Sequence, residues 1–134
     1  MFRYIISAFF LVPQIYAQNF SLKDTLRGAL SNERIWFDVN YYHLSIDLDV
    51  ESKSISAYND IAFTVLEKSS KMQLDLFENL TIDSVVFKNE LCKVTRQFDT
   101  FFIDLPFEFK IGGSQTIRVY YHGNPIVAKN APWD

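Results

Sequence analysis

The stretch Val39-Asn40-Tyr41-Tyr42-His43-Leu44-Ser45-Ile46-Asp47-Leu48-Asp49-Val50 decides the fold, because apolar and polar side chains alternate along it. From position 42 to position 50 the even residues are Tyr, Leu, Ile, Leu and Val, and the odd residues are His, Ser, Asp and Asp. Successive side chains of a β-strand point to opposite faces of the sheet. The period of two therefore predicts a half-buried strand, with one apolar and one solvated face.

A second alternating run covers residues 55–65 and follows the first after a polar turn. Its apolar side chains stand at Ile55, Ala57, Ile61, Phe63 and Val65, and polar side chains lie between them. Two such runs joined by a short polar segment are typical of an antiparallel hairpin. The two stretches together predict a long β-hairpin.

Shorter alternating runs at 72–76, 80–87, 91–96, 101–105 and 116–121 predict five further strands. Polar residues 67–71 and 88–90 and the pair Gly112-Gly113 separate them as turns. The sequence predicts an all-β fold of about seven strands, arranged as a curved antiparallel sheet or β-sandwich. Residues 123–134 contain two prolines and no alternation, so we expect a linking loop there.

The segment before the first strand carries a helix start signal. Ser21 followed three residues later by Asp24 is typical of an N-cap with a reciprocal acid, and Leu26 and Leu30 follow at helical spacing. A short helical turn is expected within residues 18–30, and a loop at 31–34.

Residues 1–17 resemble a secretory signal peptide, with one basic residue, a short apolar stretch and a small residue, Ala17, before the expected cut. A buried N-terminal helix or strand is the alternative. Cleavage would leave an exported chain, periplasmic or extracellular, with its β domain at 18–122, a linking loop at 123–134 and no transmembrane segment. Of the 13 basic residues in the chain only Arg3 would be lost, leaving 12 against 16 acids, which argues against a nucleic-acid partner.

The inventory of reactive side chains is small. His43 and His122 are the two histidines, and they form no recognisable ligand set for zinc. Cys92 is the one cysteine, so no intramolecular disulfide can form, and a half-buried strand thiol is expected rather than a nucleophile. Gly112-Gly113 has no helix after it, so we expect a turn there and not a phosphate cradle.

Paired carboxylates are the other candidates for catalysis. Asp47 and Asp49 share one strand face, and Asp75 could lie across from them. A general acid needs a raised pKa, which burial would supply, whereas the alternation places Asp47 and Asp49 on the polar side. We interpret them as part of a solvated acidic face and assign no catalytic, cofactor-binding or metal-binding residue.

Aromatic residues are frequent and allow two interpretations. Rings lined up on one sheet face could bind sugars, but most rings here occur in adjacent pairs, which point to opposite faces. Core packing is therefore the preferred interpretation. The rings considered are Trp36, Phe37, Tyr41, Tyr42, Tyr58, Phe101, Phe102, Phe107, Phe109, Tyr120, Tyr121 and Trp133.

A series of short motifs runs in order along the chain. They are Thr25-Leu26-Arg27-Gly28, Glu33-Arg34, Trp36, Asp38-Val39, Tyr41-Tyr42, Leu44, Ile46-Asp47-Leu48, Ser54-Ile55-Ser56, Met72-Gln73-Leu74-Asp75-Leu76, Ile82-Asp83-Ser84-Val85, Phe102-Ile103-Asp104-Leu105-Pro106, Ile117-Arg118-Val119-Tyr120-Tyr121-His122-Gly123-Asn124-Pro125 and Ala131-Pro132-Trp133-Asp134. In this order they resemble the start of a zinc metalloaminopeptidase of the aminopeptidase N family, in its Bacteroidetes-type form. One departure is Ala57, where the family favours Gly.

The resemblance implies a saddle-like β domain that packs over a separate, thermolysin-like zinc domain. The family's H-E-x-x-H helix, distal Glu ligand, G-x-M-E-N motif and transition-state tyrosine would all lie downstream, and this sequence contains none of them. No site residue can therefore be carried over. The implied zinc belongs to the downstream domain, and the implied partner is a peptidase catalytic domain, in cis or in trans.

The expected function is a non-catalytic fragment that supports and covers the catalytic domain of an exported zinc metalloaminopeptidase. One alternative is a free-standing binding module for carbohydrate or a protein partner, with Tyr41 and Tyr58 as candidate contacts. Another is a structural domain that docks on a separately encoded catalytic chain. If the domain packs on a neighbour, it should expose a large apolar patch and tend to self-associate.

Overall fold

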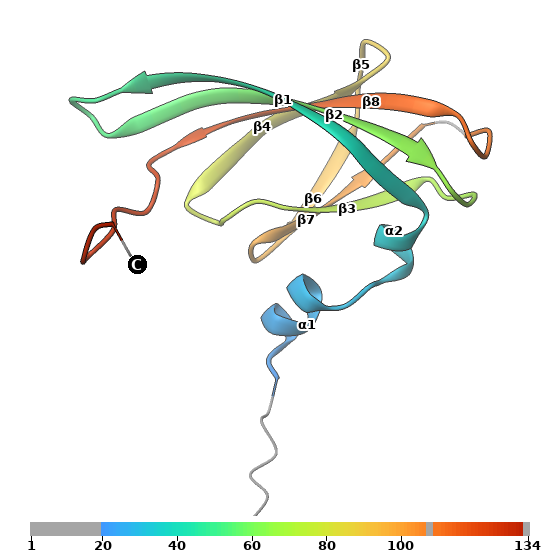
Figure 1. Ribbon diagram of the computed structural model, residues 1–134, viewed down its shortest axis with the longest axis horizontal. Coiled ribbons are helices and arrows are strands. Elements are labelled where there is room, and N and C mark those ends of the chain that lie inside the picture. The colour runs from blue at the N-terminus through green and yellow to red at the C-terminus, as the bar shows by residue number, and fades with distance from the viewer. Residues whose placement is uncertain (1–19, 107–108, 133–134) are drawn as a thin grey trace, which may run out of the picture.

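The computed structural model describes residues 20–106 and 109–132, and antiparallel strands dominate it (Figure 1). The elements are α1 (Leu22–Gly28), α2 (Asn32–Ile35), β1 (Phe37–Asp49), β2 (Ser54–Val65), β3 (Lys71–Asp75), β4 (Leu80–Phe87), β5 (Glu90–Leu91), β6 (Lys93–Gln97), β7 (Thr100–Asp104) and β8 (Ser114–Gly123). The predicted all-β class is confirmed. The signal segment predicted at 1–17, together with Phe107 and Trp133, lies outside the described residues.

The strands form two sheets. The large sheet has the strand order β1-β2-β8-β4-β5 and the small sheet the order β3-β7-β6, with all neighbours antiparallel. The large sheet arches over the small one, and the β1–β2 hairpin extends beyond it (Figure 1). This is the curved, sandwich-like arrangement that the alternating runs predict.

The core fills the space between the sheets and consists of apolar side chains from both. Its members are Trp36, Ile61, Phe63, Val65, Met72, Val85, Phe87, Phe101, Ile103, Leu105, Phe109, Ile117 and Val119. Phe63 is fully buried and contacts the edges of the Trp36 and Phe109 rings, with centroids 5.8 and 6.4 Å away. Core packing is therefore confirmed for Trp36 and Phe109 but is wrong for Tyr41 and Tyr42, which are 62% and 55% exposed. Ring burial supplies a large part of the apolar area removed from water.

A bulge in β1 keeps its apolar side chains on one face. Val39 lies opposite Phe63, but Tyr41 lies opposite Ala62, so Asn40 is the extra residue. Such an insertion shifts the alternation from odd to even positions. Thus Val39 before the bulge and Tyr42 after it both belong to the inner face of the large sheet, which faces the small sheet.

The predicted run at 91–96 divides into β5 and β6. Cys92 lies between them, where the chain leaves the large sheet after β5 and crosses to the small sheet. The turn before β5 is confirmed, since Lys88 and Asn89 have φ values of 50° and 67°. Two residues with positive φ between paired strands form a type I′ hairpin turn.

The helix expected before the first strand is α1. Ser21 Oγ accepts a hydrogen bond from the Asp24 N–H at 3.2 Å, and the Asp24 carboxylate accepts one from the Ser21 N–H at 3.0 Å. This reciprocal pair is the predicted capping box. The prediction of a loop at 31–34 is wrong, because the chain forms a single helical turn there, α2, with Ser31 as its N-cap residue.

Candidate docking face

The inner face of β1 is apolar but uncovered. Tyr42, Leu44, Ile46 and Leu48 are 48–66% exposed, although they share a sheet face with buried Ile61 and Ala57 of β2. The prediction that this strand is half-buried is therefore wrong for these residues. The physical reason is the size of the small sheet, since the hairpin extends past it (Figure 1).

The exposed row continues onto neighbouring strands. Leu48 lies opposite Ile55 of β2, and Ala57 lies opposite Tyr121 of β8. Tyr121 is half-buried, and burial raises the pKa of its phenol. We call this uncovered part of the inner face the open face. It consists of Tyr42, Leu44, Ile46, Leu48, Ile55 and Tyr121. Contiguous exposed apolar surface marks an interaction site in soluble proteins.

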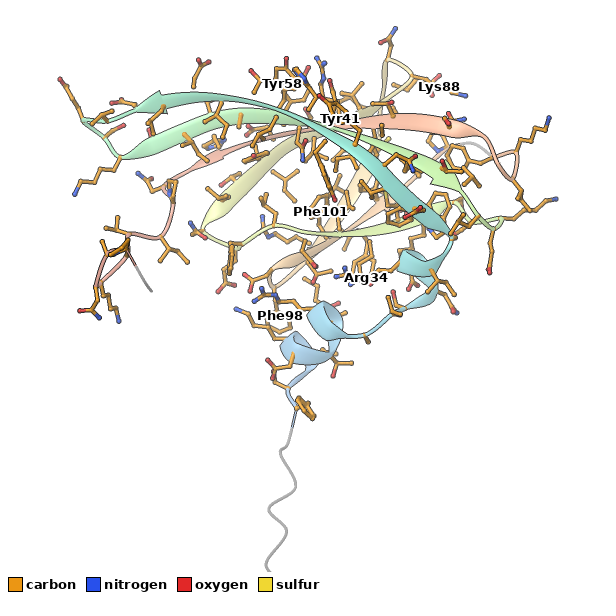
Figure 2. The ribbon with its side chains drawn as sticks, in the orientation of Figure 1. Arg34, Tyr41, Tyr58, Lys88, Phe98 and Phe101 are labelled. Atoms are coloured by element: carbon orange, nitrogen blue, oxygen red, sulfur yellow. The ribbon has the colours of Figure 1, made fainter. Side chains whose placement is uncertain are left out.

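A pocket of about 420 Å³ lies between the sheets where the core meets the open face. It is lined by residues of β1, β2 and β8 from the large sheet and of β3 and β7 from the small sheet, together with Leu30 and Arg34. Figure 2 shows Phe101, one of the lining residues, pointing into the space between the sheets. The pocket makes this boundary concave and largely apolar.

Two polar atoms at this pocket are buried without a hydrogen-bond partner among the described residues. They are Arg34 Nε, a donor, and Asn59 Oδ1, an acceptor. An unsatisfied buried polar group costs about 1–3 kcal/mol, so both atoms would gain a hydrogen bond if the pocket opened enough to admit a water molecule or a polar group. The Arg34 side chain is held in place by its Nη2, which donates to the Leu26 carbonyl at 3.1 Å and to Asp75 Oδ1.

The carboxylates considered from the sequence do not converge. Asp47 and Asp49 are exposed on the outer face of β1, as the alternation predicts. Asp75 does not lie across from them. It belongs to β3 in the small sheet, where Arg34 and the Thr100 hydroxyl bind it. The earlier expectation failed because sequence alternation gives the face of a residue but not its sheet.

The other reactive residues also lie apart. His43 is exposed and its ring stacks on Tyr58 with centroids 6.2 Å apart, and His122 pairs through Nδ1 with Asp83 Oδ1 at 2.6 Å. Cys92 is half-buried, and burial raises the pKa of its thiol, which disfavours the reactive thiolate. Within residues 20–106 and 109–132, no three His, Cys, Asp or Glu side chains are grouped closely enough to hold a metal ion.

On the outer face of the large sheet, side chains of the neighbouring strands cover the Tyr58 ring. Arg118 of β8 pairs with Asp60 through two hydrogen bonds of 2.6 and 2.7 Å, and its guanidinium lies 4.1 Å from the Tyr58 ring centroid. Because His43 and Arg118 contact Tyr58 from the strands on either side, its ring offers little free surface for a sugar. Tyr41 and Tyr58 both lie on this outer side (Figure 2), and Tyr41 is the more exposed of the two.

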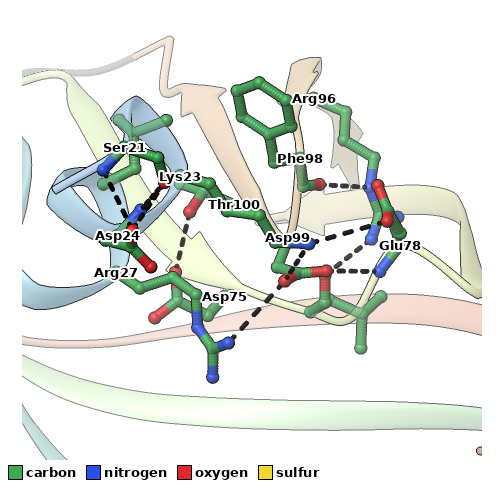
Figure 3. Close-up of polar contacts among 12 residues, drawn as sticks. Ser21, Lys23, Asp24, Arg27, Asp75, Glu78, Arg96, Phe98, Asp99 and Thr100 are labelled. Atoms are coloured by element: carbon green, nitrogen blue, oxygen red, sulfur yellow. Dashed lines mark hydrogen bonds and ion pairs between the residues drawn. The ribbon is translucent and has the colours of Figure 1, made fainter. Parts of the chain in front are cut away.

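A polar cluster that the sequence did not indicate joins α1 to the small sheet (Figure 3). Its centre is Asp99, buried in the turn between β6 and β7, which accepts hydrogen bonds from the Glu78 N–H at 2.9 Å and lies 3.1 Å from Lys23 Nζ. These partners lower the pKa of Asp99, the Glu78 backbone contact most of all and then Lys23. Arg96 ties this turn to the β3–β4 connection, because it donates to the carbonyl of Phe98 in the turn and to the carbonyls of Leu76 and Leu80.

This cluster supports the fold and leaves few groups available for chemistry. The sequence offered one weak signal for it, the polar segment 97–100 between two alternating runs. Phe98 obscured the turn, because it has a φ of 54°, a conformation that aromatic residues seldom adopt.

No helix within the described ranges is long and apolar enough to cross a bilayer.

Comparison with solved structures shows that the fold is similar to part of M1 zinc metallopeptidases. The enzyme from Deinococcus radiodurans aligns with a TM-score of 0.61 and 18% identity over 73% of this chain and 23% of its own. Its E323A mutant bound to a Tyr-Ser-Ala substrate aligns with a TM-score of 0.62 and 17% identity, over 72% of this chain and 22% of that one.

Native leukotriene A4 hydrolase from Saccharomyces cerevisiae is also similar, with a TM-score of 0.56 and 18% identity over 69% of this chain and 16% of its own. No protein-family model and no curated protein matches the sequence. At these identities the likeness shows the fold alone. The chain spans less than a quarter of each of these metallopeptidase chains.

Proposed function

We propose that this chain is a non-catalytic, amino-terminal saddle domain of an exported zinc metalloaminopeptidase, in its Bacteroidetes-type form. It supports and covers a catalytic domain that lies in cis or in trans. The observation that carries the proposal is the open face, an apolar part of the large sheet that the small sheet leaves uncovered. The likeness to M1 zinc metallopeptidases supports a peptidase catalytic domain as its cover.

The open face fits such a cover better than it fits a small ligand. It combines an exposed apolar row on β1 with a concave pocket, beside which two buried polar atoms, Arg34 Nε and Asn59 Oδ1, have no hydrogen-bond partner among the described residues. An apolar centre with a few polar groups is the usual composition of a protein interface. The chemistry of peptide hydrolysis would then reside in the partner, which supplies the zinc.

The first test is hydrolysis of aminoacyl-naphthylamides by the purified chain with added zinc. We expect no turnover, since the described residues hold no group of metal ligands. Robust turnover that a chelator abolishes would sink the proposal.

The second test is docking. The partner to use is the zinc-peptidase catalytic domain encoded downstream in the same reading frame or, if the frame closes, a chain of the same organism that lacks a saddle of its own. Isothermal titration should detect binding, and Leu44→Lys should weaken it at least about tenfold by placing a charge in the apolar centre. Thr116→Lys, on the exposed outer face of β8, is the matched control and should bind like the parent chain.

Export is tested separately. Expression of the full chain in a bacterial host, followed by fractionation and amino-terminal sequencing, should recover a protein that begins at Gln18 outside the cytoplasm. Recovery of the intact amino terminus in the cytoplasm would contradict the signal-peptide assignment and would leave the docking proposal in place.

A further inference from the structure

The outer edge of β1 has no neighbouring strand in the part of the chain that the structure describes. β1 is the first strand in the order of the large sheet and pairs only with β2. Its regular part, Tyr41–Asp49, lies between the bulge at Asn40 and the turn that starts at Val50. An open edge presents a row of backbone N–H and C=O groups that can pair with another strand.

Natural edge strands are protected by proline, by charged side chains, especially lysine and charges that point inward, or by bulges. The segment Tyr41–Asp49 contains no proline and no lysine, and its pairing with β2 shows no irregularity. Its inner side chains are the exposed apolar row already described. Its two carboxylates, Asp47 and Asp49, are on the outer face and not among the inner side chains. An edge without proline, lysine or a bulge, beside uncovered apolar side chains, is suited to pairing with a second strand of similar composition.

We propose that two copies of this chain pair through their β1 edges, antiparallel, about a twofold axis at Ser45. The two large sheets would then form one continuous sheet. This goes beyond the proposed docking function, because it uses the backbone edge of the sheet, together with adjoining open-face side chains, and a second copy rather than a catalytic domain.

The register follows from two geometric conditions. Residues directly opposite each other in an antiparallel pair point to the same face, so an outer residue must meet an outer residue for the two inner faces to be continuous. The longest overlap of two regular segments is reached when Tyr41 of one copy lies opposite Asp49 of the other. Both conditions place Ser45 opposite Ser45 of the second copy.

Side chains are complementary in this register. On the outer face His43 lies opposite Asp47 of the second copy, and symmetry produces this contact twice. On the inner face Leu44 meets Ile46, and Tyr42 meets Leu48. An imidazole N–H facing a carboxylate can donate a hydrogen bond between the strands. Apolar cross-strand pairs stabilise a sheet, and no carboxylate opposes another carboxylate.

Slipped registers are less favourable. Centring the pair on Asp47 would shorten the overlap and place two Asp47 carboxylates opposite each other. Centring it on His43 shortens the overlap equally and places two imidazoles opposite each other. Centring it on Leu44 or Ile46 keeps the faces matched but also shortens the overlap. Like carboxylates directly opposite each other destabilise a strand pair, so charge disfavours the Asp47 register, and overlap favours the axis at Ser45 over every slipped register.

Cross-linking of single-cysteine variants tests the register. In a Cys92→Ser background of the full chain, Ser45→Cys should form a covalent dimer with a thiol-specific reagent that spans a few ångströms, because directly opposite Cβ atoms lie about 4.5–5.5 Å apart. Asp49→Cys should not, since its counterpart would lie about 26 Å away along the strand. Thr116→Cys, exposed in the middle of the sheet, is the control for random collision.

A charge swap tests the contact between the copies without cross-linking. His43→Asp should raise the dimer dissociation constant about tenfold in sedimentation equilibrium, because an acid then faces Asp47 on both sides. Adding Asp47→Lys should restore dimerisation, and circular dichroism checks that both variants fold. A parent chain that sediments as a monomer at several hundred micromolar, or equal cross-linking at positions 45 and 49, would overturn the proposal.

Discussion

At the scale of the residue, Gly123 shows why a particular amino acid is needed at the end of β8. Its φ is 145°, and a Cβ placed there would lie 2.7 Å from the Asn79 carbonyl oxygen. Gly123→Ala should therefore destabilise the chain by about 1–3 kcal/mol in urea unfolding. Gly28→Ala is the matched control, because nothing lies within 4 Å and α1 gains a better helix former. Equal stability of the two variants would contradict this assignment.

Asp99 makes the stability of the chain depend on pH in acid. Its lowered pKa means that it stabilises the fold above the unfolded value of about 3.9, and that this contribution is lost as pH falls through the folded pKa. Asp99→Asn should lower the melting temperature at pH 7, and the difference from the parent chain should shrink below about pH 4. Asp104→Asn, at an exposed residue 4.0 Å from Lys93, should have little effect at either pH.

Single residues also show how far sequence reasoning reached. Alternation correctly assigned Asp47 and Asp49 to the solvated face, because side-chain direction in a strand is a local property. It failed for Asp75 and missed Asp99, because their partners Arg34, Lys23 and Glu78 are distant in sequence. Pairing across sheets depends on tertiary packing, which no local pattern encodes.

At the scale of the element, the helix α1 and the strands were predictable from the sequence to within a few residues. The capping box at Ser21 identified α1, and the predicted runs correspond to β1–β4, β7 and β8, with one run divided into β5 and β6. The burial of β1 was not predictable. Its apolar face has the sequence pattern of a face that packs in the core, yet the small sheet is too short to cover it. Alternation shows which face is apolar but not what covers it.

The capping box of α1 predicts the behaviour of that helix. Ser21→Ala removes the side-chain acceptor for the Asp24 N–H and should destabilise the helix by about 1 kcal/mol. Hydrogen exchange should report this locally, because the amides of Thr25 and Ala29 donate within the first and last turns. Ser69→Ala, outside any helix, is the control. Unchanged protection at Thr25 would contradict a capping role.

At the scale of the whole molecule, the small sheet divides the large sheet into a covered half and an open half. Ile61, Ile117 and Phe87 lie opposite one another across β2, β8 and β4, and the small sheet covers them. The other half contains the hairpin tip and the open face. This division explains how a chain with a dense aromatic core still exposes a continuous apolar row.

The division predicts two levels of hydrogen-exchange protection. Amides near Phe63 and Ile117 should exchange only through global unfolding, because buried contacts surround them, whereas those of residues 46–57 should exchange through local opening of the tip. Binding of the catalytic domain should raise protection in residues 42–57 and leave the amides near Phe63 unchanged. Thr116→Lys should preserve this response and Leu44→Lys should reduce it. Uniform protection in the free chain would mean that the open half is held by contacts other than those described, and would argue against a face that requires a cover.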